Sequence, residues 1–214
     1  MNAPHADGER EALITAARAL GVTLTDPQAA SLLRLLDELS LWNRAYNLTA
    51  ITGRAAMIRD HLLDSLSAAP ELSGTRIADV GTGAGFPGLP LALVAPERRF
   101  TLIDSVAKKI RFVAHAAREL ALTNVAPLQA RAEQLVPEAP FDTIITRAFA
   151  PVPVTLERVD RLARSGTRLV ALKGRYPHEE LAQLPPRWTL QSVRRVSLPG
   201  SDAERHIVRL AALS

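Results

Sequence analysis

Apolar residues recur every three or four positions in the first third of the chain, which is the spacing of one face of an amphipathic helix. This spacing predicts helices at residues 9–20, 27–46 and 54–69. Asp26 stands directly before Pro27, and this pair favours the start of a helix with the aspartate as its N-cap. The polar and aromatic segment at 42–51 is most simply interpreted as a tight connection between two helices, capped by asparagine.

From residue 75 onward, short apolar runs alternate with helical periods. The runs predict seven strands, at residues 76–80, 99–104, 123–128, 141–146, 167–173, 188–196 and 205–211. Helices are predicted at residues 87–95, 106–120, 152–164 and 177–184. This alternation indicates an α/β fold with a mostly parallel sheet and helices on both faces. Only turn residues, Leu198 to Asp202, separate the last two strands, so we expect the sheet to end in an antiparallel hairpin.

Chain length bounds the domain organisation. A chain of 214 residues is long enough for one sizeable α/β domain and little more. We therefore expect a single domain over 1–214, with a helical N-terminal extension at 1–70 and the ligand-binding core at 71–214. The apolar faces of the extension are too long for an isolated helical hairpin to bury, so its helices should pack on the core. We expect the protein to act as a monomer.

Composition excludes several classes of protein. The chain has no cysteine, which rules out disulfides and thiolate metal sites and suits a reducing cytosol. Residues 1–10 are polar and lack the apolar run of a signal peptide, and no later stretch is long and apolar enough for a membrane span. We expect a cytoplasmic protein that neither associates with a membrane nor binds a metal ion.

The charge is unevenly distributed along the chain. The net charge is +4, from 26 lysines and arginines against 22 aspartates and glutamates. Residues 1–70 hold 6 basic against 8 acidic side chains, whereas residues 71–214 hold 20 against 14. Most of the basic residues are arginines, whose guanidinium suits bidentate contact with phosphate. The basic excess is a modest indication of a nucleic-acid partner.

The strongest chemical signal is the stretch from Arg76 to Gly88. An apolar strand reaches Asp79 near its end, and Gly81, Gly83 and Gly85 then alternate with small residues before the next helix. A strand, a glycine turn and a helix in this order let a ligand approach bare backbone. Alternating glycines also permit positive φ angles and leave no Cβ in the way. An ordinary surface turn does not need three of them.

Two cofactor classes compete for this loop. The segment from Gly83 to Gly88 fits the G-x-G-x-x-G fingerprint of dinucleotide binding. The register from Asp79 to Gly85 instead resembles motif I of the class I S-adenosylmethionine-dependent methyltransferases. An acid just before the first glycine favours the second class, because it would repel a pyrophosphate and attract the cationic methionine end of the cofactor. Asp104 ends the next strand and could accept hydrogen bonds from ribose hydroxyls, which suits either class.

Further blocks of polar and aromatic residues are spread over most of the chain. They are Trp42-Asn43 with Asn47-Leu48-Thr49-Ala50-Ile51, Arg59 to Leu66, Asp79 to Gly88, Asp104-Ser105 with Lys108-Lys109, Arg131-Ala132-Glu133, Arg147 to Ala150, and Leu172-Lys173-Gly174. In this order they resemble the RsmG/GidB family of bacterial small-subunit ribosomal RNA guanine-N7 methyltransferases. Residues 1–30 and the last two strands contribute little to the match. Leu89-Pro90 stands where the family often has a second basic residue.

The resemblance implies a class I methyltransferase (Rossmann-like) fold, S-adenosyl-L-methionine as cofactor and small-subunit (16S) ribosomal RNA, alone or within the ribosomal subunit, as substrate. Family cofactor contacts fall on Gly81, Phe86, Ala132, Glu133 and Arg147, which join Asp79, Gly83, Gly85 and Asp104 from the motif. Asn47, His61 and Lys173 are candidates for contact with the base or the RNA backbone, and Asp64 could orient His61 from one helical turn away. Lys173 and Arg147 end adjacent strands, so both cations are expected to reach past the sheet edge toward phosphate.

The implied reaction is methyl transfer to guanine N7, a nitrogen with a free lone pair and no proton. It needs no general base, so catalysis would consist of positioning and electrostatics. Two other functions remain open at this point: a nucleotide-binding oxidoreductase of the NAD type, and a non-catalytic RNA-binding module. Single residues also have plainer interpretations, with Glu133 as a helix cap, Arg147 as a surface arginine and His61 as a buried histidine.

Overall fold

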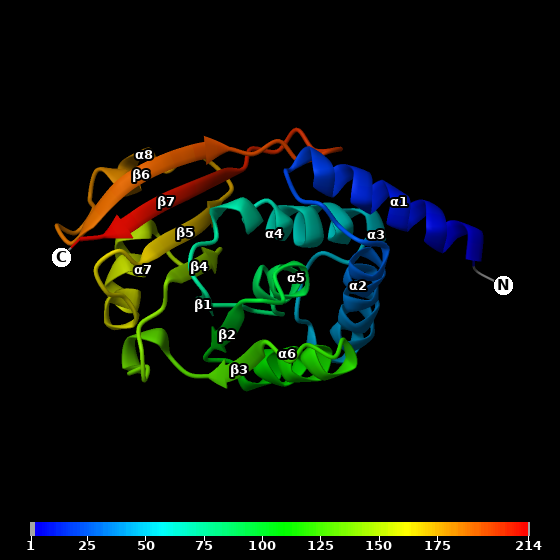
Figure 1. Cartoon of the computed structure of the whole chain (residues 1–214), viewed down its shortest axis with the longest axis horizontal. Helices are drawn as coiled ribbons and strands as arrows, with labels where there is room; N and C mark the ends of the chain where they lie inside the picture. The colour runs from blue at the N-terminus through cyan, green and yellow to red at the C-terminus, as the bar shows by residue number, and fades with distance from the viewer. Residues whose placement is uncertain (1–2, 214) are drawn as a thin grey trace.

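The computed structural model describes residues 3–213, which form one mixed sheet with helices on both faces (Figure 1). The strands are β1 (Arg76–Val80), β2 (Arg99–Asp104), β3 (Val125–Gln129), β4 (Thr143–Arg147), β5 (Arg168–Lys173), β6 (Trp188–Arg195) and β7 (His206–Ala212). Their order across the sheet is β3-β2-β1-β4-β5-β7-β6. β1 to β5 are parallel, and β7 runs antiparallel to both β5 and β6. The predicted α/β class and the antiparallel end of the sheet are confirmed.

The strand order reverses between β1 and β4, because β2 and β3 lie on one side of β1 and β4 and β5 on the other. In open α/β sheets, loops at the carboxyl ends of the strands separate at such a point and leave a crevice. The glycine loop that follows β1 therefore stands at the position where this fold binds ligands.

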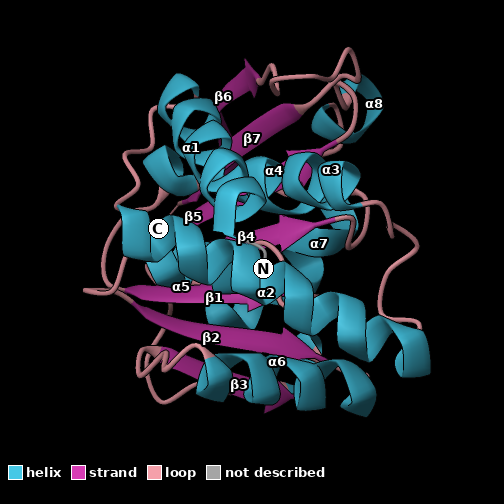
Figure 2. Cartoon of the chain, turned by 90° about the vertical axis from the view of Figure 1, so that its right-hand side faces the viewer, coloured by secondary structure: helices cyan, strands magenta, loops and turns pink. Residues whose placement is uncertain are grey.

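The helices divide between the two faces of the sheet (Figure 2). They are α1 (Ala3–Ala19), α2 (Asp26–Tyr46), α3 (Arg54–Met57), η1 (Ile58–Leu63), α4 (Asp64–Leu66), η2 (Ala69–Glu71), α5 (Gly88–Val94), α6 (Ala107–Glu119), η3 (Ala132–Gln134), α7 (Val152–Val159), η4 (Asp160–Leu162) and α8 (His178–Leu181). Buried side chains of α1, α2, α5 and α6 form one apolar cluster with one face of the sheet, whereas α7 and η4 cover the other face. Among residues 3–213, no helix is long and apolar enough to cross a membrane.

The N-cap of α2 lies one residue before the predicted position. Thr25 caps the helix: its Oγ1 accepts a hydrogen bond from the Gln28 amide, and Gln28 Oε1 accepts one from the Thr25 amide. This reciprocal pair satisfies two amides at once, so it places Asp26 in the first turn instead of at the cap. At the other end, Asn47 is the C-cap with a left-handed φ of 47°, which confirms the predicted asparagine cap.

The predicted third helix, 54–69, is not a regular α-helix. Its central six residues, Ile58–Leu63, form a π-helix between the short α-helices α3 and α4. A π-helical turn is wider than an α-helical one and frequently occurs at functional sites. Apolar spacing did not indicate it, because the buried residues Leu62, Leu63 and Leu66 suit either helix type. The π-turn contains Asp60 and His61, which belong to the site described next.

Candidate active site at the carboxyl edge of the sheet

The glycine loop between β1 and α5 carries three alternating glycines with different roles. Gly81, Gly83 and Gly85 all have positive φ angles, of 72°, 61° and 84°. A Cβ on Gly81 would lie 2.4 Å from the Phe149 ring, and one on Gly85 would lie 2.3 Å from Leu89. A Cβ on Gly83 would meet nothing closer than the Gly81 carbonyl oxygen, at 4.0 Å. Gly81 and Gly85 thus make room for protein side chains, and Gly83 presents bare backbone to open space.

Asp79 lies beneath the loop and not at its mouth, where the sequence placed it. Its side chain is fully buried, and its Oδ2 accepts hydrogen bonds from Thr82 Oγ1 at 2.6 Å and from the Gly88 amide at 2.8 Å. Oδ1 is buried without a hydrogen-bond partner among the described residues. Burial raises the pKa of Asp79 to about 6, although the two hydrogen bonds oppose the shift. The carboxyl group therefore fixes both ends of the loop, and any effect on a ligand would act through the loop.

Asp104, at the end of β2, reaches the loop from the neighbouring strand. Its Oδ2 accepts a hydrogen bond from the Gly83 amide at 3.0 Å, and Lys109 Nζ lies 3.4 Å from the same oxygen. Its Oδ1 accepts from the Val106 amide at 2.9 Å. The carboxylate thus binds both the glycine loop and the start of α6, and it lines a hollow of about 250 Å³.

Ala132 and Glu133 lie in the wall of this smaller hollow, with the Phe149 ring. Ala132 is buried and Glu133 is exposed, 4.0 Å from Arg131. The hollow shares Gly81, Lys109 and Ala148 with a larger cavity of about 740 Å³, so the two are neighbouring parts of one site. Ala148 has a left-handed φ of 49° between Arg147, which lines the larger part, and Phe149, which lines the smaller.

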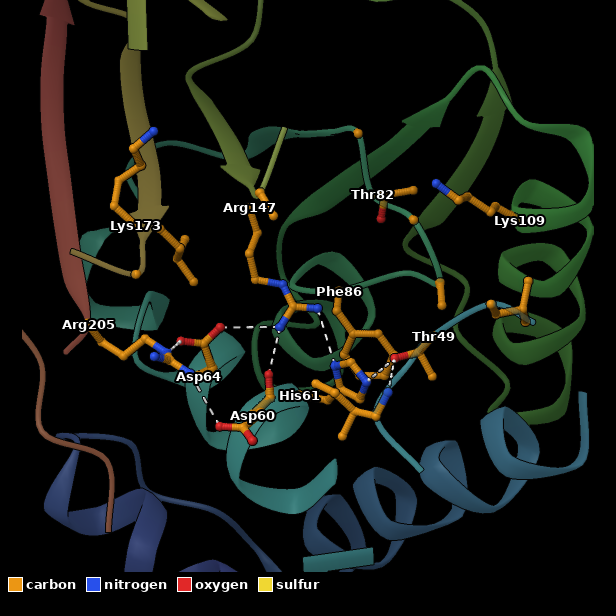
Figure 3. A pocket seen from close by; sticks show the side chains of 18 of the residues that line it. Thr49, Asp60, His61, Asp64, Thr82, Phe86, Lys109, Arg147, Lys173 and Arg205 are labelled. Carbon is orange, nitrogen blue, oxygen red and sulfur yellow. Dashed lines mark hydrogen bonds and ion pairs between the residues drawn. The ribbon is translucent and has the colours of Figure 1, made fainter. Parts of the chain in front are cut away.

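Arg147, at the end of β4, lines the larger cavity, and its side chain points toward Asp60, His61 and Asp64 (Figure 3). Its Nη1 donates to the Asp60 carbonyl oxygen at 2.8 Å and lies 3.2 Å from Asp64 Oδ2. Its Nη2 lies 3.3 Å from His61 Nδ1, and the guanidinium stands 5.7 Å from the centroid of the Phe86 ring. The π-turn therefore supplies the carbonyl group, the imidazole and, one residue after its end, the carboxylate that hold this arginine.

The geometry assigns the tautomer of His61. A guanidinium only donates hydrogen bonds, so Nδ1 is the acceptor and the proton is on Nε2. Nε2 donates to Thr49 Oγ1 at 3.0 Å, and the ring stacks on Phe86 with a centroid distance of 4.7 Å. Burial, together with the charge of Arg147, lowers the pKa of His61 to about 4. The imidazole is neutral at physiological pH, and both of its nitrogens are occupied.

The expectation that Asp64 orients His61 is wrong. Asp64 is bound to Arg147 and lies 3.4 Å from Nε of Arg205, the residue before β7. Burial raises its pKa despite the two arginines. Arg147 is the residue that orients His61. Phe86 is also almost fully buried, between His61 and Arg147, so only a small part of this residue lines the cavity.

Lys173, at the end of β5, lines the larger cavity beside Arg147 as predicted. It does not extend freely past the sheet edge, because Nζ lies 2.7 Å from Glu180 of α8. Both cations that were expected to contact phosphate thus have a carboxylate partner in the chain itself. The interpretation of Arg147 as a surface arginine is also wrong, since its side chain is only 20% exposed.

Asn47 is exposed and does not line the cavity, whereas the next two residues do. The asparagine that organises this segment is Asn43, which sequence reasoning passed over. Asn43 Oδ1 accepts hydrogen bonds from the amides of Leu48 and Thr49 at 2.6 and 2.9 Å, and its Nδ2 donates to the Thr49 carbonyl oxygen at 3.0 Å. Its place in the block Trp42-Asn43 was the available signal.

Two observations show that this arrangement suits a nucleoside cofactor. Gly83 offers bare backbone to the cavity, and the Asp104 carboxylate stands beside it at the end of β2. Among the side chains that the structure describes, no group of His, Cys, Asp and Glu is arranged to hold a metal ion. His61, in the cavity wall, has no free nitrogen for use as a general base.

The sheet order, with the antiparallel strand β7 between β5 and β6, defines the class: this is a class I methyltransferase, which uses S-adenosylmethionine. The glycine loop after β1 and the acid at the end of β2 agree with this class, although dinucleotide-binding proteins share them. The fold is similar to an O-methyltransferase from Bacillus cereus in complex with SAH, with a TM-score of 0.57 at 19% identity over 83% of this chain and 90% of that one. It is also similar to a SAM-dependent methyltransferase from Aquifex aeolicus, with a TM-score of 0.55 at 20% identity over 74% and 93%.

The family follows from two further comparisons. Residues 28–208 match the model of the GidB family, rRNA small subunit methyltransferase G. A relative from Serratia proteamaculans, "Ribosomal RNA small subunit methyltransferase G", is 47% identical over 91% of this chain and 95% of its own. The chain belongs to this family, which confirms the resemblance found in the sequence. The oxidoreductase alternative receives no support.

Proposed function

We propose that this protein transfers a methyl group from S-adenosylmethionine to N7 of a guanine in small-subunit (16S) ribosomal RNA. The observation that supports this best is that the smaller hollow, whose lining suits a nucleoside, opens into the larger cavity at Gly81 and Ala148. The histidine of the larger cavity, His61, is not free to act as a general base, because both of its nitrogens are hydrogen-bonded. A reaction at guanine N7 requires no base, because this nitrogen has a lone pair and no proton to remove.

The proposed roles follow from position. The cofactor, when bound, supplies an electrophilic methyl group on a sulfonium. Asp104 and the Gly83 backbone would hold its ribose, Ala132 and Glu133 would line its adenine, and Gly81 and Phe86 would border its methionine end. Asp79 and Gly85 fix the loop from behind. Arg147 lies between the glycine loop and the π-turn, where it would hold in place the residues that line the substrate part of the cavity.

The target guanine would occupy the larger cavity. A bound S-adenosylmethionine would supply the methyl carbon to the N7 lone pair, and the sulfur would keep the electron pair of the carbon–sulfur bond that breaks. N7 lies in a deep and narrow groove of an RNA helix, so the target base must be unpaired or splayed out. The protein would act as a monomer in the cytoplasm, and size-exclusion chromatography with light scattering would test the first of these.

The test is methyl transfer from labelled S-adenosylmethionine to RNA of cells that lack the gene. Small-subunit RNA and whole small subunits are offered separately, and the methylated base is mapped by strand cleavage at 7-methylguanine. We expect one labelled guanine. Label on another atom or another RNA would contradict the proposal, and binding of S-adenosylhomocysteine and RNA without transfer would favour the non-catalytic alternative.

A further inference from the structure

Thr49 forms part of the larger cavity wall and is held there rigidly (Figure 3). The Asn43 side chain makes three hydrogen bonds to the backbone of residues 48–49, so the chain cannot rotate at this point without losing them. The Thr49 side chain lies beside His61 in the wall of the cavity that the glycine loop also lines. Its hydroxyl group therefore has a fixed position next to the space in which a substrate base would lie.

The hydrogen bonds of this hydroxyl group leave one atom unassigned. A threonine oxygen has two lone pairs and one hydrogen. His61 Nε2 donates to Oγ1 at 3.0 Å, as the tautomer requires, and the Ile51 amide donates to it at 3.1 Å. Both lone pairs are thus used, and only the hydrogen remains. Among the groups that the structure describes, none accepts it.

The hydroxyl group of Thr82, also in the cavity wall, does not have this property. Thr82 donates its hydrogen to Asp79 Oδ2 at 2.6 Å. The cationic side chains Arg147 and Lys173 are paired with Asp64 and Glu180. Thr49 thus differs from these wall residues, because it offers an uncharged donor and, at the same time, no acceptor.

We propose that the Thr49 hydroxyl group donates a hydrogen bond to O6 of the target guanine and thereby selects guanine over adenine. This inference rests on the proposed function. Guanine presents O6 and N7 as two neighbouring acceptors, whereas adenine presents an amino group in place of O6. A donor at O6 leaves the N7 lone pair free to react. The same hydroxyl group cannot accept a hydrogen bond from the adenine amino group, because both of its lone pairs are occupied.

The inference is tested with RNA in which the mapped guanine is replaced by 2-aminopurine, which keeps N7 and the 2-amino group but lacks O6 and, with it, the N1 hydrogen. Inosine, which keeps N7 and O6 but lacks the 2-amino group, is the matched control. We expect kcat/KM of the wild type to fall about 10- to 100-fold on 2-aminopurine, because the donor is left unpaired. The rate on inosine should remain close to that on guanine.

Thr49→Val and Thr49→Ser complete the cycle. Thr49→Val should have a reduced kcat/KM on guanine RNA, and replacement of the guanine by 2-aminopurine should not reduce it further. The ratio of its kcat/KM on guanine to that on adenine should be smaller than in the wild type. Thr49→Ser should keep the wild-type pattern. Thr49→Val also removes the hydrogen-bond acceptor of His61, but this structural effect slows guanine and 2-aminopurine RNA equally, so the cycle separates the two.

Three results would overturn the inference: a wild type that is indifferent to 2-aminopurine, a loss of the same size on inosine, or a Thr49→Val variant as sensitive to 2-aminopurine as the wild type. Should Thr49→Val fail to fold, Thr49→Ala replaces it in the cycle, because it also removes the hydroxyl group. The variant is needed, since 2-aminopurine differs from guanine at N1 as well as at O6. Failure of the proposed function looks different, because the wild type would then transfer no methyl group to guanine N7 of the unmodified RNA.

Discussion

The guanidinium of Arg147 and the carboxylate of Asp64 lie 3.2 Å apart, with side-chain exposures of 20% and 9%, in the wall of the larger cavity. Removal of Arg147 leaves the buried Asp64 carboxylate with Arg205 as its one remaining cationic partner within the described chain, and it also takes the hydrogen-bond donor from the Asp60 carbonyl oxygen and from His61 Nδ1. We expect Arg147→Met to reduce the free energy of unfolding by about 3 kcal/mol, measured by urea denaturation. The control is Arg164→Met, which breaks an ion pair with Asp142 whose arginine is 61% exposed and should cost less than about 1 kcal/mol. Equal losses would show that the Arg147 pair is no more buried in solution than a surface pair.

The pKa of His61 predicts how stability depends on pH. Its folded value of about 4 lies below the value of 6.5 expected for an unfolded chain, so the unfolded state binds more protons between these limits. Stability from this residue is fully present above pH 6.5 and is lost as pH falls toward 4. Between pH 7 and pH 5 the loss should be about 2 kcal/mol.

His61→Gln removes the titrating group and should flatten the pH dependence over this range. Asp79 titrates with the opposite sign, because its folded pKa is raised to about 6, but it contributes equally to both proteins. The measurement is the free energy of unfolding of each protein at several pH values. Parallel curves for wild type and variant would mean that His61 keeps an ordinary pKa in the folded protein.

Gly83 should be required for cofactor binding more than for folding. Gly83→Val places a branched side chain in the open space that the ligand needs, at a φ of 61°. Gly166→Val is a matched control, because Gly166 has a φ of 83° and an added Cβ there would also have no atom closer than 4 Å, but this glycine does not line the cavity. Both variants should lose about 1–2 kcal/mol of stability from backbone strain.

Only Gly83→Val should lose affinity for S-adenosylhomocysteine in calorimetry. Unaltered binding by Gly83→Val would place the cofactor elsewhere. The wild type should not bind NAD, and tight binding of NAD would contradict the choice of cofactor.

We expect the ion pair with Glu180 to weaken the interaction of Lys173 with RNA. Its carboxylate lies 2.7 Å from Lys173 Nζ, so Glu180→Gln should free one cation at the cavity. RNA affinity should then rise, and the slope of log K against log salt should steepen by about 1. Lys173→Ala should weaken RNA binding and leave affinity for S-adenosylhomocysteine unchanged.

The neighbouring Glu179 has no ion-pair partner in the described part of the chain, so Glu179→Gln controls for the change in net charge alone. Equal effects of the two glutamine variants would reduce the Glu180 effect to general electrostatics. Loss of cofactor binding in Lys173→Ala would move Lys173 into the cofactor pocket.

We propose that residues 1–70 fold as part of the same unit as the sheet. Leu32 and Leu36 of α2 are fully buried in the cluster that contains Ile77 and Phe100 of the sheet. Deletion of 1–70 would expose this apolar face, so the remainder should aggregate or bind hydrophobic dyes. A remnant that is soluble and unfolds cooperatively would show that the chain has two domains.

The strands and the glycine loop were predictable because their signals are local. A run of apolar residues identifies β1 and β2, and alternating glycines identify the loop whatever the rest of the chain does. The predicted position of Asp79 was wrong because its depth depends on Thr82 and Gly88, which fold back over it. Spacing along the chain does not give the direction of a side chain at the end of a strand.

The π-turn and the role of Asn43 could not be predicted for a related reason. The turn contacts Arg147, which lies 87 residues after Asp60 in the sequence. Asn43 and Asn47 are chemically alike, and only the path of the backbone between them shows which one clamps the segment. The partners of polar side chains that are distant in the sequence can be identified only once the fold is known.

The insertion of β7 between β5 and β6 has a consequence for protein synthesis. β7, at His206–Ala212, is the last strand along the chain and yet an interior strand of the sheet. Until the ribosome has released it, β5 presents an unpaired edge, and β6 has no neighbour to pair with. An open edge is a template for association with other chains. A nascent chain that stalls before His206 should therefore be the most aggregation-prone form of this protein, because the sheet is closed only once β7 has been synthesised.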